Sequence, residues 1–220
     1  MKLFEEQQET PLFAALKKYV EDKTVSFHVP GHKGGKGIPE FRSFVGENIL
    51  SIDVTSGILD LDTICNPLGV IREAEDLAAS AFGADYAHFL VNGTTSGIQA
   101  MILSVAGPGD EIIVPRNAHR SVVGGLILSS AKPVYIKPVI DDYMGIAMGI
   151  TPESVRRAIV EHPNAKAVFV INPTYYGVAS DLKKIVEIAH SYGKPVIVDE
   201  AHGAHLGFHP DLPISAMEAG

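Results

Sequence analysis

The feature that most constrains the fold is a regular alternation of short apolar segments with longer amphipathic ones between residues 71 and 199. Segments rich in Val, Ile or aromatic residues lie at 86–91, 111–115, 133–137, 166–171 and 195–199. Stretches with helical spacing lie between them or before them, at 71–83, 97–107, 121–130, 151–162 and 180–193. Buried strands separated by helices of this length are typical of βαβ units. We therefore predict an α/β fold, a three-layer, mainly parallel sheet with helices on both faces.

Residues 1–45 precede this alternation and are predicted to form an N-terminal arm, with the major domain at 46–220. Within the arm, Thr10 and Pro11 begin a helical apolar pattern. VSFHV, residues 25–29, fits a short strand, and PGHKGGKG, residues 30–37, is a glycine-rich basic loop. This loop loosely resembles a phosphate cradle, and it also fits a flexible basic loop without a ligand.

Composition and charge exclude several classes of protein. A chain of 220 residues with 46% hydrophobic content can bury a sizeable core, which argues against disorder. A net charge of −8 gives no broad basic face, so we expect no nucleic-acid partner. The single cysteine, Cys65, excludes an intramolecular disulfide and suits a reducing cytoplasm. Residues 1–20 fit neither a signal peptide nor a membrane span, so we expect a cytoplasmic protein without a membrane partner.

Ligands of open parallel sheets bind beyond the carboxyl ends of the strands, so the residues that follow each strand are the first candidates. NGTTSG, residues 92–97, joins a predicted strand to a predicted helix. Free N–H groups and hydroxyls at such a helix start favour a phosphate, although the same residues also serve as an ordinary N-cap. The segment is neither a Walker loop nor GxGxxG, and the chain has no G-x-S-x-G elbow of a serine hydrolase.

Two further segments follow predicted strands. His119 could stack on a flat ligand or act as an acid or base, and it also fits a surface histidine without a function. Arg116 and Arg120 beside it could bind an anion or be solvated. NPTYYG, residues 172–177, offers Thr174 and its neighbours to a ligand hydroxyl, although Asn-Pro is also a common way to start a turn.

Asp199 ends the apolar segment 195–199, where a carboxylate beside the core needs a cationic or hydrogen-bonding partner. A protonated ring nitrogen or a metal ion would satisfy it. A metal would also recruit His202, His205 and His209, but these lie in a Gly-containing loop that does not aim them at one ion. In a third interpretation Asp199 caps the next segment and the histidines are exposed. We predict no metal site.

The four segments together offer a phosphate seat, a partner for a flat ring, a hydroxyl contact and a carboxylate. Pyridoxal 5′-phosphate needs all four, because its ring nitrogen stays protonated only beside a carboxylate. We therefore expect pyridoxal 5′-phosphate as the cofactor.

The chain also carries longer motifs in a fixed order: VPGHKGG, FGADYAHFLVNGTTSGIQAMI, GDEIIVPRNAHRSVVGGLILSSAKPVYI, INPTYYGVASDLKKIVEIAH and VIVDEAHGAHLGFHP. With these it resembles the bacterial ornithine/lysine/arginine decarboxylases of the shorter, Bacillus-like type, which are fold-type I enzymes that use pyridoxal phosphate. The resemblance implies that the phosphate is held at 93–96, that His119 stacks on the ring and that Asp199 pairs with the ring nitrogen. The implied cofactor contacts are Gly93, Thr94, Thr95, Ser96, His119, Thr174, Asp199, Ala201 and His202, with Asp199, His119 and His202 as the candidate catalytic residues.

The Schiff-base lysine of that family follows the VIVDEAHGAH segment, whereas the last lysine here, Lys194, precedes it. We therefore expect a fragment that stops before this lysine, lacks the small C-terminal domain and is inactive alone, with a natural truncated product as the alternative. The intact protein is expected to decarboxylate arginine, lysine or ornithine to its amine in polyamine metabolism, as a homodimer or higher homo-oligomer. An aminotransferase or aldolase of the same fold, and a non-catalytic binding module, remain alternatives.

Overall fold

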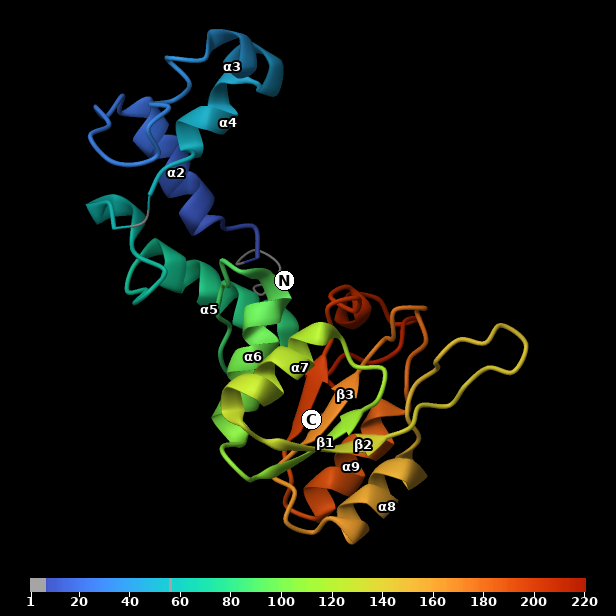
Figure 1. Ribbon diagram of the computed structural model, residues 1–220. Helices are drawn as coiled ribbons and strands as arrows, with labels where there is room; N and C mark the ends of the chain where they lie inside the picture. The colour runs from blue at the N-terminus through green and yellow to red at the C-terminus, as the bar shows by residue number, and fades with distance from the viewer. Residues whose placement is uncertain (1–6, 56) are drawn as a thin grey trace. The chain divides into compact units, whose positions relative to one another are not determined.

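The computed structural model describes residues 7–55 and 57–220, and the chain divides after Phe89 into two compact units (Figure 1). The sequence analysis predicted an N-terminal arm at 1–45 and the major domain at 46–220. In the structure the helical N-terminal part continues to Phe82 before the chain enters the second unit.

The first unit contains the helices α2 (Pro11–Glu21), α3 (Pro39–Val45), α4 (Glu47–Ile52) and α5 (Val70–Phe82), and the short 3-10 helix η1 (Leu59–Leu61). As the sequence predicted, a proline occupies the first turn of α2 and Gly83 ends α5 in the left-handed region, with a φ of 68°. The strand predicted at 25–29 is wrong. Phe27 is 94% exposed there, and no strand among the described residues pairs with the segment.

Asp62 organises the chain that leads into α5. Its carboxylate accepts hydrogen bonds from the backbone N–H groups of Thr63 at 2.7 Å, Leu68 at 3.1 Å, Gly69 at 2.8 Å and Ile71 at 3.2 Å. Burial raises the pKa of Asp62, but these four donors outweigh it and lower the pKa from 3.8 to about 2. One ionised side chain thus supplies the acceptors that the N-terminal turn of α5 requires.

The second unit is the predicted α/β sheet. Its strands are β1 (Glu111–Pro115), β2 (Lys132–Ile136), β3 (Val168–Ile171) and β4 (Val196–Asp199), all parallel, in the order β2-β1-β3-β4. The helices are α6 (Gly93–Val105), α7 (Arg120–Ser129), α8 (Pro152–Glu161) and α9 (Leu182–Ser191), followed by the 3-10 helix η2 (Leu206–Phe208). The strand predicted at 86–91 is wrong: Tyr86 is 70% and Val91 77% exposed, and no strand among the described residues pairs with them.

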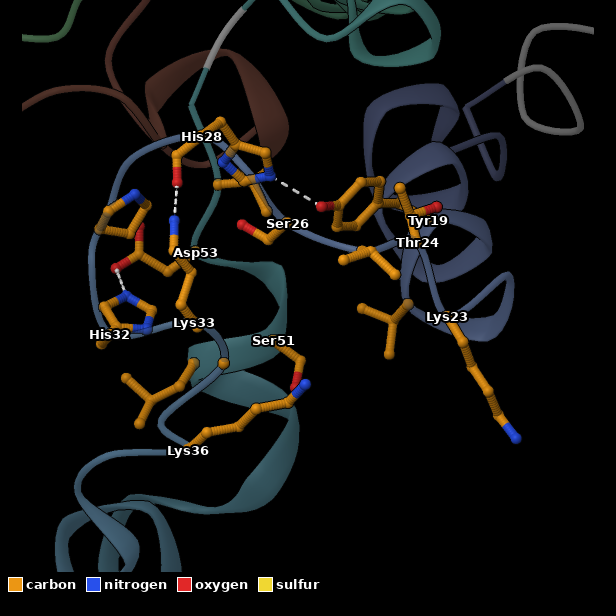
Figure 2. Close-up of a pocket in the computed structure, with 16 residues that line it drawn as sticks. Tyr19, Lys23, Thr24, Ser26, His28, His32, Lys33, Lys36, Ser51 and Asp53 are labelled. Carbon is orange, nitrogen blue, oxygen red and sulfur yellow. Dashed lines mark hydrogen bonds and ion pairs between the residues drawn. The ribbon is translucent and has the colours of Figure 1, made fainter.

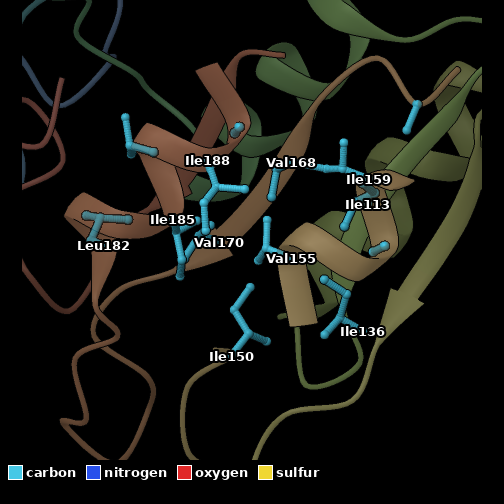
Figure 3. Close-up of a cluster of buried hydrophobic side chains, with 14 residues drawn as sticks. Ile113, Ile136, Ile150, Val155, Ile159, Val168, Val170, Leu182, Ile185 and Ile188 are labelled. Atoms are coloured by element: carbon cyan, nitrogen blue, oxygen red, sulfur yellow. The ribbon is translucent and has the colours of Figure 1, made fainter. Parts of the chain in front are cut away.

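The alternation of side chains along the strands builds two cores, one on each face of the sheet. Ile112 and Val114 of β1 pack with Ile98 and Ile102 of α6 and with Val122 of α7. On the other face, the intervening β1 residue Ile113 packs with α8 and α9, in the cluster shown in Figure 3. Figure 1 shows the corresponding layers, with α6 and α7 over one face and α8 and α9 over the other. The three-layer prediction is confirmed for this unit.

Lys194, just before β4, is buried at the amino end of this strand, opposite the carboxyl ends where ligands of parallel sheets bind. Its ammonium donates hydrogen bonds to the carbonyls of Pro163, at 2.7 Å, and Ala165, at 2.6 Å. Because β4 runs from Val196 to Asp199, Lys194 lies at the amino end of the strand and Asp199 at its carboxyl end. Within the described residues, no helix is both long and apolar enough to cross a membrane.

Candidate cofactor site

A cavity of about 520 Å³ opens at the carboxyl ends of the strands of the second unit. β1 leads to Asn117 and His119, β3 to Thr174 and β4 to Asp199, as expected for an open parallel sheet. The lining residues are Thr94, Thr95, Asn117, His119, Ser121, Ala147, Ile171, Thr174, Tyr175, Tyr176, Asp199, Ala201 and His202. Seven of the nine residues predicted from the sequence therefore lie around one cavity. Gly93 and Ser96 do not line it.

The N-terminus of α6 supplies the hydroxyls of the cavity. Asn92 is the N-cap residue, but its side chain makes no capping hydrogen bond, so the first-turn N–H groups lack the usual side-chain acceptor. Thr94 and Thr95 line the cavity. Ser96 instead turns back along its own helix, where its hydroxyl donates to the carbonyl of Gly93 at 2.9 Å. The ordinary N-cap considered from the sequence is thus not formed by Asn92, and two hydroxyls and a helix N-terminus remain for an anion.

His119 is held in place by the helix it begins. As the N-cap of α7, its Nδ1 accepts a hydrogen bond from the backbone N–H of Ser121 at 3.2 Å and lies 2.9 Å from the Ser121 hydroxyl. An Nδ1 that accepts a backbone N–H carries no hydrogen, so the ring hydrogen lies on Nε2. The capping interaction therefore fixes both the orientation of the ring and its tautomer. Arg116 points elsewhere, with its guanidinium 4.7 Å from the centre of the Tyr135 ring.

Asp199 is a buried carboxylate that nevertheless faces the cavity. Asp199 is 6% exposed and lines the cavity, and its Oδ1 accepts a hydrogen bond from the N–H of Ala201 at 3.2 Å. This is the local capping contact considered from the sequence, and it uses one of the two oxygens. No Lys or Arg lines the cavity, and within residues 7–55 and 57–220 Asp199 has no ion-pair partner within 4.0 Å. A cationic ligand would offset the cost of burying this charge.

The turn after β3 and the loop after β4 form an aromatic wall. Thr174 is 2% exposed and its Oγ1 accepts from the N–H of Val178 at 3.3 Å, while Tyr175 beside it is exposed. The Tyr175 ring packs edge-on against Tyr176, with centroids 5.5 Å apart, and against His202, with centroids 5.8 Å apart. The wall therefore presents flat faces and polar edges to the cavity.

Glu200, next to Asp199, points into the protein instead. Its Oε1 accepts from the N–H of Ala216 at 2.9 Å. Burial, with help from the nearby Glu218 charge, raises the pKa of Glu200 although the Ala216 hydrogen bond opposes this. Gly203 packs tightly in the same loop, since a Cβ there would lie 2.6 Å from Glu200 Cγ and 2.8 Å from Pro173 Cδ. The loop after β4 therefore packs against the turn after β3 at Gly203, where there is no room for a side chain.

Sequence reasoning missed Asn117, Ser121, Ala147, Ile171 and Tyr176. Asn117 could have been found, since it follows β1 as His119 does. Its Oδ1 is buried and has no hydrogen-bond partner among the described residues, while its Nδ2 lies 3.5 Å from the carbonyl of Met148. Ala147 comes from the long connection after β2 and carries no chemical signal in the sequence. The described residues hold no cluster of three His, Cys, Asp or Glu side chains suited to a metal ion.

The sequence was also compared with known proteins. Residues 10–220 match the profile of the family described as Orn/Lys/Arg decarboxylase, major domain. The chain belongs to this family. An arginine decarboxylase of Bacillus subtilis (strain 168) is 56% identical over 97% of this chain and 44% of its own length. A lysine decarboxylase of Pseudomonas aeruginosa is 30% identical over 90% of this chain and 29% of its own length.

The fold agrees with this membership. The solved lysine decarboxylase A from Pseudomonas aeruginosa superimposes with a TM-score of 0.82, covering 99% of this chain and 31% of that chain, at 28% identity. The chain thus spans less than half the length of the curated decarboxylases it matches. The resemblance inferred from the five sequence motifs is confirmed at the level of the family.

Proposed function

We propose that this chain holds pyridoxal 5′-phosphate in a decarboxylase that converts a basic amino acid, arginine in the first instance, to its amine. The observation that carries the proposal is the cavity that brings Thr94 and Thr95, His119 and Asp199 together. Arginine is favoured over lysine and ornithine because the Bacillus subtilis relative at 56% identity is an arginine decarboxylase. The family membership supports the reaction class.

The residues of the cavity fit the cofactor. The N-terminus of α6, with Thr94 and Thr95, suits a phosphate dianion, and the unpaired, buried carboxylate of Asp199 suits a protonated ring nitrogen. His119, oriented by its capping bond, offers a ring face for stacking. Thr174 would offer its hydroxyl to the cofactor, and Ala201 and His202 line the same cavity. The donors, the acceptor and the flat surfaces present in the cavity thus match the parts of the molecule.

When bound, pyridoxal phosphate draws into its ring the electrons that remain as carbon dioxide leaves the substrate. The protein residues would set the conditions for this. Asp199 would hold a proton on the ring nitrogen, since its negative charge in a buried position favours the protonated form. Thr94, Thr95 and the first turn of α6 would fix the phosphate and so the position of the ring. His119, on the ring face, would restrict its tilt and exclude water from that side.

The test of this proposal is Asp199→Asn in the complete enzyme. The amide keeps the shape of the carboxylate but not its charge, so we expect the cofactor still to bind through Thr94 and Thr95 while turnover falls about a hundredfold or more. Turnover is followed by the carbon dioxide and agmatine formed from arginine. Asp142→Asn, an exposed carboxylate of the same unit, is the matched control and should leave turnover unchanged. An Asp199→Asn enzyme of normal activity would remove Asp199 from the proposed role.

The same assay separates decarboxylation from the other reactions of the fold. A decarboxylase releases carbon dioxide without a keto-acid acceptor, whereas an aminotransferase requires one and an aldolase forms neither agmatine nor carbon dioxide. We further propose a cytoplasmic homo-oligomer that supplies amines to polyamine metabolism. The exposed, unpaired Cys65 supports a reducing compartment.

A further inference from the structure

The first unit contains a second cavity of about 520 Å³, which the proposed reaction does not use. It is built by the end of α2, the loop that includes PGHKGGKG, and the end of α4, and Figure 2 shows its lining residues. All of these elements lie within the first unit. The glycine-rich basic loop, which the sequence analysis left without an assigned role, is therefore one wall of a formed cavity.

The lining of this cavity is positively charged although the protein as a whole carries a net charge of −8. It includes Lys23, Lys33 and Lys36 against a single carboxylate, that of Asp53. Asp53 is already engaged, because its Oδ2 lies 3.1 Å from Nε2 of His32. Within residues 7–55 and 57–220, none of the three lysines has a carboxylate within 4.0 Å.

The side chains are arranged to leave donors available. The Lys33 ammonium donates to the backbone carbonyl of His28, which uses one of its three N–H groups and holds it over the cavity (Figure 2). Lys36 extends toward Ser51 in the same view, while Lys23 points outward. Nδ1 of His32 is buried and has no hydrogen-bond partner among the described residues. Lys33 and Lys36 thus border one space, while Nδ1 of His32 is enclosed by protein atoms beside it.

Neighbouring contacts fix the loop that carries these groups. The Tyr19 hydroxyl of α2 lies 2.7 Å from Nε2 of His28, and the carbonyl of His28 in turn receives Lys33. Gly35, with a φ of 77°, packs so closely that a Cβ would lie 2.6 Å from Cδ1 of Leu50. The loop is therefore tied to α2 at one end and to α4 at the other, which gives the lysines a defined position.

We infer that this cavity binds an oxyanion, a phosphate or carboxylate group of a small molecule, through Lys33 and Lys36. A cluster of like charges in a concave site repels itself unless an anion neutralises it. The volume falls within the range of roughly 300–1,000 Å³ that small-molecule sites occupy. Charge-assisted hydrogen bonds from ammonium groups to phosphate or carboxylate oxygens are among the stronger polar contacts in proteins.

The experiment is a calorimetric titration of the complete protein, loaded with pyridoxal phosphate and then dialysed to remove the excess, with inorganic phosphate and separately with acetate at low ionic strength. Binding of phosphate indicates a phosphorylated ligand and binding of acetate alone indicates a carboxylate, and either supports the inference. Lys33→Met and Lys36→Met should each lower the affinity for the anion about tenfold, the loss expected for one charge-assisted contact. Lys33→Arg keeps the charge and should lower the affinity for the anion less than Lys33→Met does.

Two controls separate this inference from other outcomes. Lys183→Met removes one exposed positive charge of α9 and should leave the affinity unchanged. Thr94→Val, in the other cavity, should also leave it unchanged, so the result does not depend on the proposed decarboxylase activity. Circular dichroism establishes that each variant is folded. Absence of saturable binding of both anions, or binding that Thr94→Val removes and Lys33→Met does not, overturns the inference.

Discussion

Two charged residues at opposite ends of β4 illustrate how this protein treats buried charge. Lys194 is 8% exposed and donates to two backbone carbonyls, so its ammonium is satisfied by the fold itself. Asp199 is 6% exposed and accepts one backbone N–H, and otherwise faces a cavity. The first arrangement stabilises the unit without any ligand, whereas in the second a cationic ligand would offset the cost of burying the carboxylate.

Lys194→Met should therefore lower stability without affecting the cofactor site. Methionine fills the space but leaves the carbonyls of Pro163 and Ala165 without their donor, which costs about 1–3 kcal/mol. Urea unfolding measures the change, and affinity for pyridoxal phosphate should stay as it was. Lys183→Met, at an exposed position, serves as the control. Equal stability of the two variants would contradict the structural role of Lys194.

Gly203→Ala should disturb both stability and cofactor binding. The added methyl would lie 2.6 Å from Glu200 Cγ, 2.8 Å from Pro173 Cδ and 3.0 Å from Leu206 Cδ1. Relieving these contacts moves the loop that carries Ala201 and His202, at a cost of about 1–3 kcal/mol. Thermal unfolding and a cofactor titration measure the two effects. Gly107→Ala is the matched control, because its Cβ would meet nothing closer than 3.9 Å.

At the scale of single elements, helix starts are specified locally. Thr151 caps α8 in a reciprocal box: its Oγ1 accepts from the N–H of Ser154 at 3.2 Å, and its own N–H donates to the Ser154 hydroxyl at 3.2 Å. Pro152 follows at the first helical position. Such signals involve residues close in sequence, which is why the helices at 11–21, 70–82, 152–161 and 182–191 were predictable from the chain alone.

Thr151→Ala should reduce the free energy of unfolding by about 1 kcal/mol. The N–H of Ser154 loses its acceptor, and the Ser154 hydroxyl that accepts from residue 151 is held less firmly. Denaturant unfolding of the variant gives the value. Ser104→Ala removes an exposed hydroxyl that bonds within α6, to Met101 at 2.7 Å, and should change it by less than about 0.5 kcal/mol. A loss at Thr151 no larger than at Ser104 would show that the box does not stabilise α8.

Strands are less predictable than helices because they depend on residues distant in sequence. Segments 25–29 and 86–91 have the composition of strands, yet no strand among the described residues pairs with either. β1 to β4 form where the apolar segments pack against helices on both faces of the sheet. The strand-end rule located His119, Thr174 and Asp199 around one cavity, and Thr94 lines the same cavity although the strand predicted before it does not form. It could not locate Ala147, whose position depends on the path of the connection after β2.

For the molecule as a whole, the division after Phe89 follows contacts rather than composition. In the first unit, the carboxylate of Asp62 holds four backbone N–H groups of the chain that leads into α5. The pKa of Asp62 in the folded protein, about 2, lies below the ordinary 3.8, so the contribution of this carboxylate to stability is fully present above pH 3.8. The contribution is lost as the pH falls from 3.8 toward 2, because the carboxylate must then be protonated.

Asp62→Asn should therefore loosen the first unit at neutral pH and remove this part of its acid sensitivity. Hydrogen–deuterium exchange of peptides from α5 reports the effect, with faster exchange expected in the variant. Peptides from β3, in the core of the second unit, provide the internal control and should exchange as before. Uniform acceleration across both units would contradict a local role for Asp62.

The cavity of the second unit offers hydroxyls, aromatic rings and a carboxylate to the proposed cofactor, but no lysine of the described residues lines it. An aldehyde cofactor held by these residues alone would form no covalent bond and could be removed by dialysis. Its dissociation constant would then measure the non-covalent share of recognition alone, a quantity that covalent attachment conceals in a loaded enzyme.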